Sequence, residues 1–338
     1  MAARNRAAYS ATTSIQERAL VLPALLLTAA LMAVGCNGAP PATDVYSSPA
    51  YWTGAATPGG AFERPFGVAA APDGGIYVTD ARHRVVRLSS SGAYLGEWGH
   101  AGNGPGEFSN PVGVAVGQDG FVYVSDYDQD RVQKFTADGR FLLAFGTHGA
   151  GPGQFDAPAG VAIDRQDHVY VADFYNSRAE EFSSDGRFIR SIGHTGRVGS
   201  GTLHYPTAVA TLADGGLIVA DAYNYDLQWF AADGRQARRV GYRLLWLWPR
   251  PAAGRGGFNV PTGVAVGPHG LVHVADSANH RVVMLSPEGR YLGDWKLRDA
   301  TPKVYSPEHI AVSTDGATAY ATDFSGNRIV VLHVEERE

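Results

Sequence analysis

The chain has 338 residues and a net charge of −5, with 42 glycines, 19 prolines and 18% charged residues. Because 45% of the residues are hydrophobic, the chain can bury a core, and the acidic balance argues against nucleic acid as a partner. Cys36 is the single cysteine, which excludes an internal disulfide and a thiolate zinc cluster.

The N-terminal segment predicts export. Three arginines (Arg4, Arg6 and Arg18) precede an apolar run over residues 19–34 that ends in small residues, the pattern of a secretory signal. We therefore predict a signal peptide over residues 1–35. An uncleaved anchor fits less well, because sixteen residues span about 24 Å as a helix against a hydrocarbon core of about 30 Å.

The residues Ala33-Val34-Gly35-Cys36 resemble a bacterial lipobox, in which the cysteine sulfur receives a lipid. This resemblance implies an exported, membrane-anchored lipoprotein that faces the periplasm or the cell exterior, with the membrane as a partner through Cys36. Residues 36–49 contain Pro40-Pro41 and Ser47-Ser48 and have the composition of a flexible tether. We predict a folded domain over residues 50–338.

The rest of the chain repeats six times. Each copy opens with a proline, at steps of 46, 47, 48, 55 and 46 residues: Pro65, Pro111, Pro158, Pro206, Pro261 and Pro307. A recurring aspartate follows in every copy: Asp80, Asp126, Asp173, Asp221, Asp276 and Asp323. A period of this length indicates a solenoid or a propeller.

The contents of the second copy favour a propeller. Its short apolar segments, residues 114–116, 121–125, 131–136 and 141–145, are separated by turn residues and predict four antiparallel strands. Four such strands form a blade, so we predict an all-β, six-bladed β-propeller. Copy six stops before its fourth strand, and residues 51–54 resemble one, so we expect the N-terminal strand to close the last blade.

The pattern G-x-G-P-G-x-F-x-x-P-x-G-V-A-V over residues 102–116, followed by V-Y-V-[ST]-D and R-V, resembles the NHL repeat. It returns over residues 149–163, and the resemblance covers roughly residues 50–335. It implies a ligand- or protein-binding platform, as in most members, although some bind RNA or are lyases. The amidating lyases of this family carry zinc-binding histidines directly after the repeat proline. Those positions here hold other residues: Phe66, Val112, Ala159, Thr207, Thr262 and Glu308.

The recurring aspartate is followed by an arginine in every copy except the fourth, and we interpret this repeated pair as scaffold. In copy four Asp226 stands in the place of the arginine and faces Asp221, which makes these two residues a weak metal candidate. Because Ca²⁺ binds six to eight oxygens, we expect instead that Asp226 turns to solvent or pairs with an arginine of a neighbouring blade.

Three histidines, His100, His148 and His194, each follow a fourth strand. That strand is the outermost one of its blade, so we expect the three side chains not to converge on one metal ion.

The loops between the second and third strands, at one mouth of the ring, are rich in aromatic and acidic residues. Exposed rings flanked by polar groups suit a protein, peptide or carbohydrate ligand, and the alternative is that some rings pack inward. The candidate binding residues in these loops are Tyr127, Phe174, Tyr175, Tyr223, Tyr225 and Phe324.

Residues 241–257 account for the long 55-residue step and contain two further candidates, Trp246 and Trp248. They predict either an extended fourth strand with a longer exit loop, or a protruding apolar element that docks on a partner or a membrane.

Together these features predict a non-enzymatic binding propeller at the bacterial cell envelope, without a cofactor and without a nucleic-acid partner. The alternative is a metal-dependent hydrolase or lyase with a divalent cation at the mouth near Asp221 and Asp226.

Overall fold

The computed structural model describes residues 45–335, apart from 242–243, 246–247, 250 and 297–304. The predicted signal peptide, Cys36 and most of the predicted tether lie outside these residues. The described part contains one short 3₁₀ turn, η1 (Ser277–Asn279), and no helix with the length and apolar character needed to cross a membrane.

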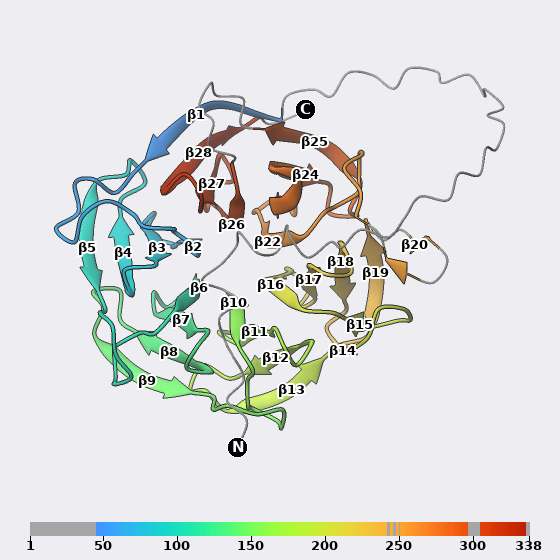
Figure 1. The fold of residues 1–338 in the computed structure, drawn as a ribbon, viewed down its shortest axis with the longest axis horizontal. Coiled ribbons are helices and arrows are strands. Elements are labelled where there is room, and N and C mark those ends of the chain that lie inside the picture. Colours follow the sequence, from blue (N-terminus) through green and yellow to red (C-terminus); the bar gives the residue numbers. More distant parts are fainter. Residues whose placement is uncertain (1–44, 242–243, 246–247, 250, 297–304, 336–338) are drawn as a thin grey trace, which may run out of the picture. The chain divides into compact units, whose positions relative to one another are not determined.

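Six four-stranded antiparallel sheets form a ring, with β2, β6, β10, β16, β22 and β26 nearest its centre (Figure 1). This arrangement confirms the predicted all-β, six-bladed propeller. From the centre outward, blades 1 to 3 consist of β2–β5 (Val68–Ala70, Ile76–Asp80, Arg84–Leu88, Tyr94–Trp98), β6–β9 (Pro111–Val116, Val122–Asp126, Arg131–Phe135, Phe141–Phe145) and β10–β13 (Pro158–Ile163, Val169–Asp173, Arg178–Phe182, Phe188–Ile192). Blades 4 to 6 consist of β16–β19 (Pro206–Thr211, Leu217–Asp221, Asp226–Phe230, Gln236–Val240), β22–β25 (Pro261–Val266, Val272–Asp276, Arg281–Leu285, Tyr291–Lys296) and β26–β28 (Pro307–Val312, Thr318–Asp323, Arg328–Val334) with β1 (Tyr46–Trp52).

The N-terminal strand completes the last blade, as predicted. β1 lies antiparallel to β28, with Tyr46 opposite Val334 and Trp52 opposite Ile329. The strand begins four residues before the predicted domain boundary, so residues 46–49 belong to the blade and not to a tether. The reason is burial: Tyr46 is 2% exposed, and its hydroxyl lies 2.7 Å from Nδ1 of His273 in blade 5.

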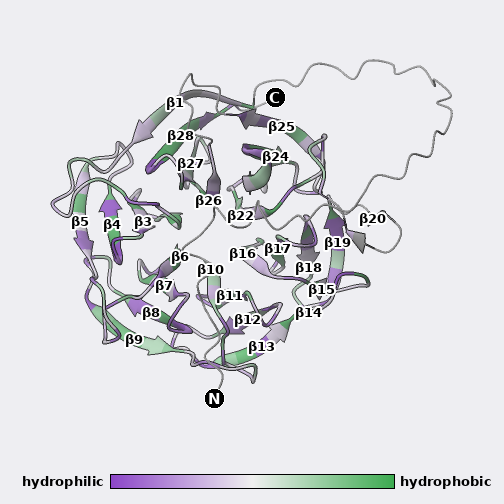
Figure 2. Ribbon diagram, viewed as in Figure 1, coloured by the Kyte–Doolittle hydropathy of each residue, from purple (hydrophilic) through white to green (hydrophobic). Residues whose placement is uncertain are grey.

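The core lies in the seams between neighbouring blades. The middle strands are buried on both faces, whereas outer strands such as β9 are only partly buried although hydrophobic (Figure 2). Rings from an outer strand pack on the next blade: Phe145 lies 4.8 Å from Phe182, and Trp98 lies 5.8 Å from Phe135. Apolar residues on the rim therefore contribute to the seams.

The glycine that follows a fourth strand makes room for the phenylalanine of the repeat. Gly146 has a φ of +92°, and a Cβ at this position would lie 2.5 Å from the ring of Phe155. Phe155 is fully buried. This close packing fixes the connector that leads into the next blade.

A residue with positive φ at the end of a second-to-third-strand loop reaches the next blade, and we call it the clasp residue. Asn327 accepts a 2.8 Å hydrogen bond from the backbone N–H of Arg64, which joins blade 6 to blade 1. Similar contacts join other blades, through His83 with Ser109, Asp130 with Ala157, Ser177 with Tyr205, and His280 with Tyr305.

Neighbouring inner strands approach so closely that one position holds glycine or alanine in five blades: Gly67, Gly113, Gly160, Ala208 and Gly263. A Cβ at Gly113 would lie 2.4 Å from the carbonyl oxygen of Ala159. Blade 6 carries His309 there, and burial lowers its pKa to about 4, although the backbone of Val68 acts in the opposite direction.

The long insertion forms a small separate hairpin. β19 ends at Val240, and β20 (Leu244–Leu245) pairs with β21 (Trp248–Pro249), so the segment is not an extension of the fourth strand. Trp248 is placed by its backbone only, and Trp246 lies outside the described residues.

Candidate functional site

The aspartate that ends each second strand fixes the mouth loops. Its carboxylate accepts a hydrogen bond from the backbone N–H of the connector residue 17 positions earlier, in all six blades. The donor and acceptor pairs are Glu63 and Asp80, Ser109 and Asp126, Asp156 and Asp173, His204 and Asp221, Asn259 and Asp276, and Ser306 and Asp323. A hydrogen bond therefore ties each loop to the connector beside it.

The predicted aspartate–arginine pair is present in blades 1, 3, 5 and 6, with N–O distances of 3.0, 2.9, 2.8 and 2.8 Å. The arginine also donates to the connector, as Arg281 does to the carbonyl of Gly257 at 2.6 Å. In blade 2, Arg131 donates to the carbonyls of Gly104 and Glu107. These contacts agree with the interpretation of the pair as scaffold.

Blade 4 reverses the polarity of this ion pair. Asp221 and Asp226 lie directly opposite each other, and Oδ2 of Asp226 lies 2.7 Å from Nε of Arg239 on β19. In blade 1 the arginine is on the third strand and the acid on the fourth, where Arg84 meets Glu97 at 2.7 Å. The partner of Asp226 therefore belongs to the same blade. Our expectation that Asp226 turns to solvent or pairs with an arginine of a neighbouring blade is wrong.

Both carboxylates of this pair are fully buried, and burial raises the pKa of Asp221 to about 7 and that of Asp226 well above its usual range. Side-chain amides of Asn224 and Gln228 donate to Asp221 at 2.7 and 2.8 Å. Both oxygens of Asp221 and Oδ2 of Asp226 already accept hydrogen bonds, whereas Oδ1 of Asp226 is buried without a partner among the described residues. Because Arg239 also supplies a positive charge, the pair suits a retained proton better than Ca²⁺.

Four of the predicted aromatic residues form one cluster across blades 2, 3 and 4, joined by Tyr205. Tyr127 lies 6.1 Å from Phe174, Phe174 stacks on Tyr205 at 5.0 Å, and Tyr205 lies 5.3 Å from Tyr223, as centroid separations. Tyr175 packs on Phe174 at 4.9 Å. We call these five residues the aromatic cluster.

The cluster has a buried base and an accessible edge. Tyr127 and Phe174 are 5% and 6% exposed, so these two rings pack inward, whereas Tyr175 is 41% exposed. Tyr205 and Tyr223 are half-buried. A ligand therefore has access to three of the five rings.

The other predicted residues lie apart from the aromatic cluster or are placed only in part. Phe324 is 9% exposed and packs edge-on against Phe66 at 6.2 Å, which joins blade 6 to blade 1. Tyr225 is half-buried and has a φ of +60° at the clasp position of blade 4. The described residues place no side chain for Trp246 or Trp248.

Sequence analysis missed Tyr205 and its neighbour His204, because both belong to the connector before β16 and not to a loop between strands. The available signal was an aromatic residue directly before the repeat proline. The pairing of Pro206 with Asp221 brings this connector to the same mouth as the loops.

A family model for the NHL repeat matches residues 108–135, 155–178 and 258–284, which lie in blades 2, 3 and 5 of the six-bladed ring. The chain is an NHL-repeat β-propeller. No curated protein sequence matches it significantly.

Solved structures with the fold of this NHL propeller include enzymes. A streptogramin B lyase is 13% identical, with a TM-score of 0.59 over 85% of this chain and 98% of the lyase. A gluconolactonase from Xanthomonas campestris is 16% identical, with a TM-score of 0.61 over 81% of this chain and 87% of that chain. A nidogen/laminin complex also matches, at 18% identity and a TM-score of 0.53 over 69% of this chain and 80% of that chain. At these identities the likeness shows the fold alone, and the fold serves both catalysis and binding.

A positive charge borders the aromatic cluster of the NHL propeller. The guanidinium of Arg197 donates to Nε2 of His204 at 2.5 Å and to the carbonyl of Tyr223 at 3.2 Å. His204 stacks on Tyr205 at 4.2 Å. Burial, with a smaller effect of Arg197, lowers the pKa of His204 to about 4, so the imidazole is a neutral acceptor near pH 7.

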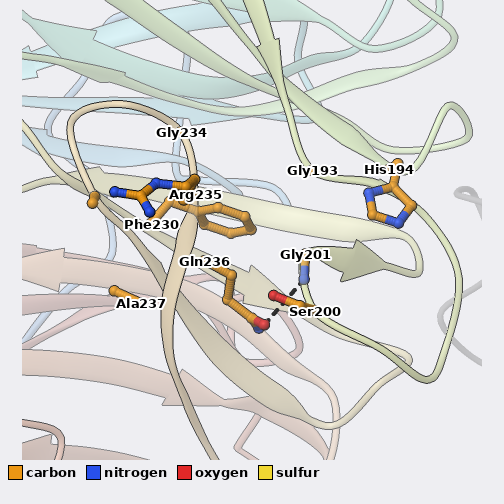
Figure 3. A pocket seen from close by; sticks show the side chains of 10 residues that line it. Gly193, His194, Ser200, Gly201, Phe230, Gly234, Arg235, Gln236 and Ala237 are labelled. Atoms are coloured by element: carbon orange, nitrogen blue, oxygen red, sulfur yellow. Dashed lines mark hydrogen bonds between the residues drawn. The ribbon is translucent and has the colours of Figure 1, made fainter.

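Two cavities in the described part of the chain lie away from this cluster. A recess of about 1070 Å³ opens at the opposite mouth, where Ile163, Thr211 and Val312 end inner strands. A second cavity of about 500 Å³ lies at the outer edge of blade 4 between His194 and Gln236 (Figure 3). There the Gln236 amide oxygen already accepts a 3.0 Å hydrogen bond from the Gly201 N–H. Neither cavity contains a predicted site residue.

Proposed function

We propose that this NHL propeller is a non-enzymatic binding module that uses the aromatic cluster to hold a protein, peptide or carbohydrate. The supporting observation is the continuous set of rings from three blades, with the accessible edge at Tyr175. The framework of aspartates and clasp residues holds these loops in place, so binding requires little ordering of the chain.

The chemistry of the edge agrees with such a ligand. Tyrosine rings offer a flat apolar face and a hydroxyl, which suit the faces of sugar rings and the side chains of peptides. Arg197 adds a fixed donor beside Tyr223.

The metal-dependent hydrolase or lyase of the alternative interpretation has less support at the residues named for it. Asp226 is held by Arg239, and Asp221 lies fully buried below the mouth. A hydrolase or lyase activity would therefore require residues other than Asp221 and Asp226 to activate water.

Replacing Tyr175 and Tyr223 together by alanine is expected to weaken ligand binding by about tenfold or more, because buried aromatic contacts dominate recognition surfaces. The measurement uses arrays of bacterial polysaccharides, peptidoglycan fragments and peptides, followed by titration of the ligands that the unchanged chain retains.

Tyr51→Ala is the matched control, since Tyr51 is 38% exposed on the rim strand β1. The proposal fails if the unchanged chain retains nothing on the arrays, or if the double variant and the control bind equally well.

We also propose that the propeller is anchored at the cell envelope through a lipid on Cys36, as the lipobox resemblance implies. A Cys36→Ser chain expressed in a bacterium is then expected to move from the membrane fraction to the soluble exported fraction. Metabolic labelling with a fatty-acid analogue measures the lipid directly. Unchanged fractionation together with no labelling of the original chain would refute this proposal.

A further inference from the structure

We infer that Asp130, His148 and Asp156 form a site for a divalent transition-metal ion, with Zn²⁺ as the best match, between blades 2 and 3. Each residue offers one ligand atom, and the three atoms lie within 4.8 Å of one another. Nδ1 of His148 lies 3.0 Å from Oδ2 of Asp130. Ligand atoms that share one ion at about 2.0–2.2 Å are separated by about 3–4 Å, so small side-chain rotations suffice.

The donor set selects the class of ion. One imidazole nitrogen and two carboxylate oxygens suit Zn²⁺ and related first-row ions, whereas Ca²⁺ and Mg²⁺ prefer oxygen ligands alone. The side chain of His148 is 62% exposed and Asp156 is half-buried, so water or a ligand oxygen has access to complete the coordination.

The backbone around the three residues is held by the scaffold. Asp130 is 3% exposed, and its Oδ1 accepts a 2.8 Å hydrogen bond from the N–H of Ala157, which leaves Oδ2 toward His148. The N–H of Asp156 donates to Asp173 at 2.9 Å. A metal ion would thus meet an Asp130 carboxylate that is already held and an Asp156 backbone that is already fixed, so its binding would order few side chains.

Among the described residues, such a combination of ligand groups occurs once in the ring. The pairing of His148 with Phe155 matches that of Ala101 with Phe108, so His148 is not equivalent to His100 although both follow a fourth strand. The positions equivalent to Asp130 hold other residues in the remaining blades: His83, Ser177, Tyr225, His280 and Asn327. Those equivalent to Asp156, by the connector hydrogen bond, are Glu63, Ser109, His204, Asn259 and Ser306. The scaffold contacts recur from blade to blade, whereas this combination of three ligand groups does not. We expect such a difference at a ligand site.

The site adjoins the aromatic cluster but does not depend on the function proposed for it. The carbonyl of Asp156 accepts a 3.0 Å hydrogen bond from the N–H of Tyr175, and Asp130 shares its loop with Tyr127. An ion here would place positive charge at the edge of the mouth.

Isothermal titration of the chelator-treated, untagged chain with ZnCl₂ tests the inference. We expect one Zn²⁺ per chain with a Kd of about 10 µM or tighter, and binding at least about tenfold weaker in His148→Ala and in Asp130→Asn. The asparagine keeps an oxygen that accepts the Ala157 N–H, and thermal melts verify that both variants fold.

His100→Ala is the matched control, because His100 is 73% exposed and lies 3.2 Å from Glu107, and no third ligand group among the described residues joins them. This variant is expected to bind Zn²⁺ as the unchanged chain does. The inference is overturned if the unchanged chain binds no Zn²⁺, if His148→Ala binds it equally well, or if His100→Ala loses binding to the same extent. Co²⁺ absorption spectra add a readout of the imidazole ligand.

Discussion

Single buried residues change the stability of the fold with pH, and they do so in opposite directions. Burial lowers the pKa of His273 and of His309 to about 4, so the unfolded chain binds protons that the folded chain does not between about pH 6.5 and 4. These histidines therefore destabilise the fold as the pH falls through that window. Burial raises the pKa of Glu180 and Glu308 to about 7, and these carboxyls destabilise the fold as the pH rises from about 4.5 to 7.

Glu308 offers a test of this balance. Its carboxyl accepts hydrogen bonds from Ser306 at 2.9 Å and Ser277 at 3.3 Å, and the amide of Glu308→Gln retains an oxygen that accepts them. At pH 8 we expect the variant to be more stable than the unchanged chain by up to roughly 3 kcal/mol, because it buries no charge. Near pH 5 the difference is expected to fall to about 1 kcal/mol or less, and it vanishes below the ordinary glutamate pKa.

Urea unfolding at the two pH values measures the effect, with Glu288→Gln on an exposed turn as the control. A stability difference that is the same at pH 5 and pH 8 would show that the carboxyl of Glu308 does not titrate as described.

At the level of strands, the pairing of β1 with β28 decides whether the ring closes. β1 buries Tyr46 and covers the backbone edge of β28, and Trp52 packs against Tyr320 at 5.5 Å. An uncovered edge has unpaired N–H and C=O groups that can pair with another chain.

A chain that begins after Trp52 is therefore expected to lose several kcal/mol of stability and to self-associate. A chain that begins at Ala42 keeps β1 and is the control. Thermal melts and light scattering after gel filtration measure the two effects. Equal melting temperatures and monomers in both cases would contradict the role given to β1.

At the level of the whole molecule, the sequence predicts the ring but only part of the site. The six blades and their closure follow from a pattern that recurs within each copy. The aromatic cluster depends on Tyr205, a connector residue, and the partner of Asp226 is Arg239, thirteen positions away on another strand. The repeat pattern does not predict contacts that occur in a single blade. Likewise, the sequence does not show that His148 and His100 occupy different positions, and only the pairing of His148 with Phe155 reveals it.

The clasp from Asn327 to the backbone of Arg64 has a mechanical consequence. The last blade holds the first through the same kind of contact that joins consecutive blades, so the circle has no terminal unit that could peel away. We therefore expect a load applied at blades 3 and 4, such as the pull of a bound ligand on their tyrosines, to reach the neighbouring blades in both directions around the ring.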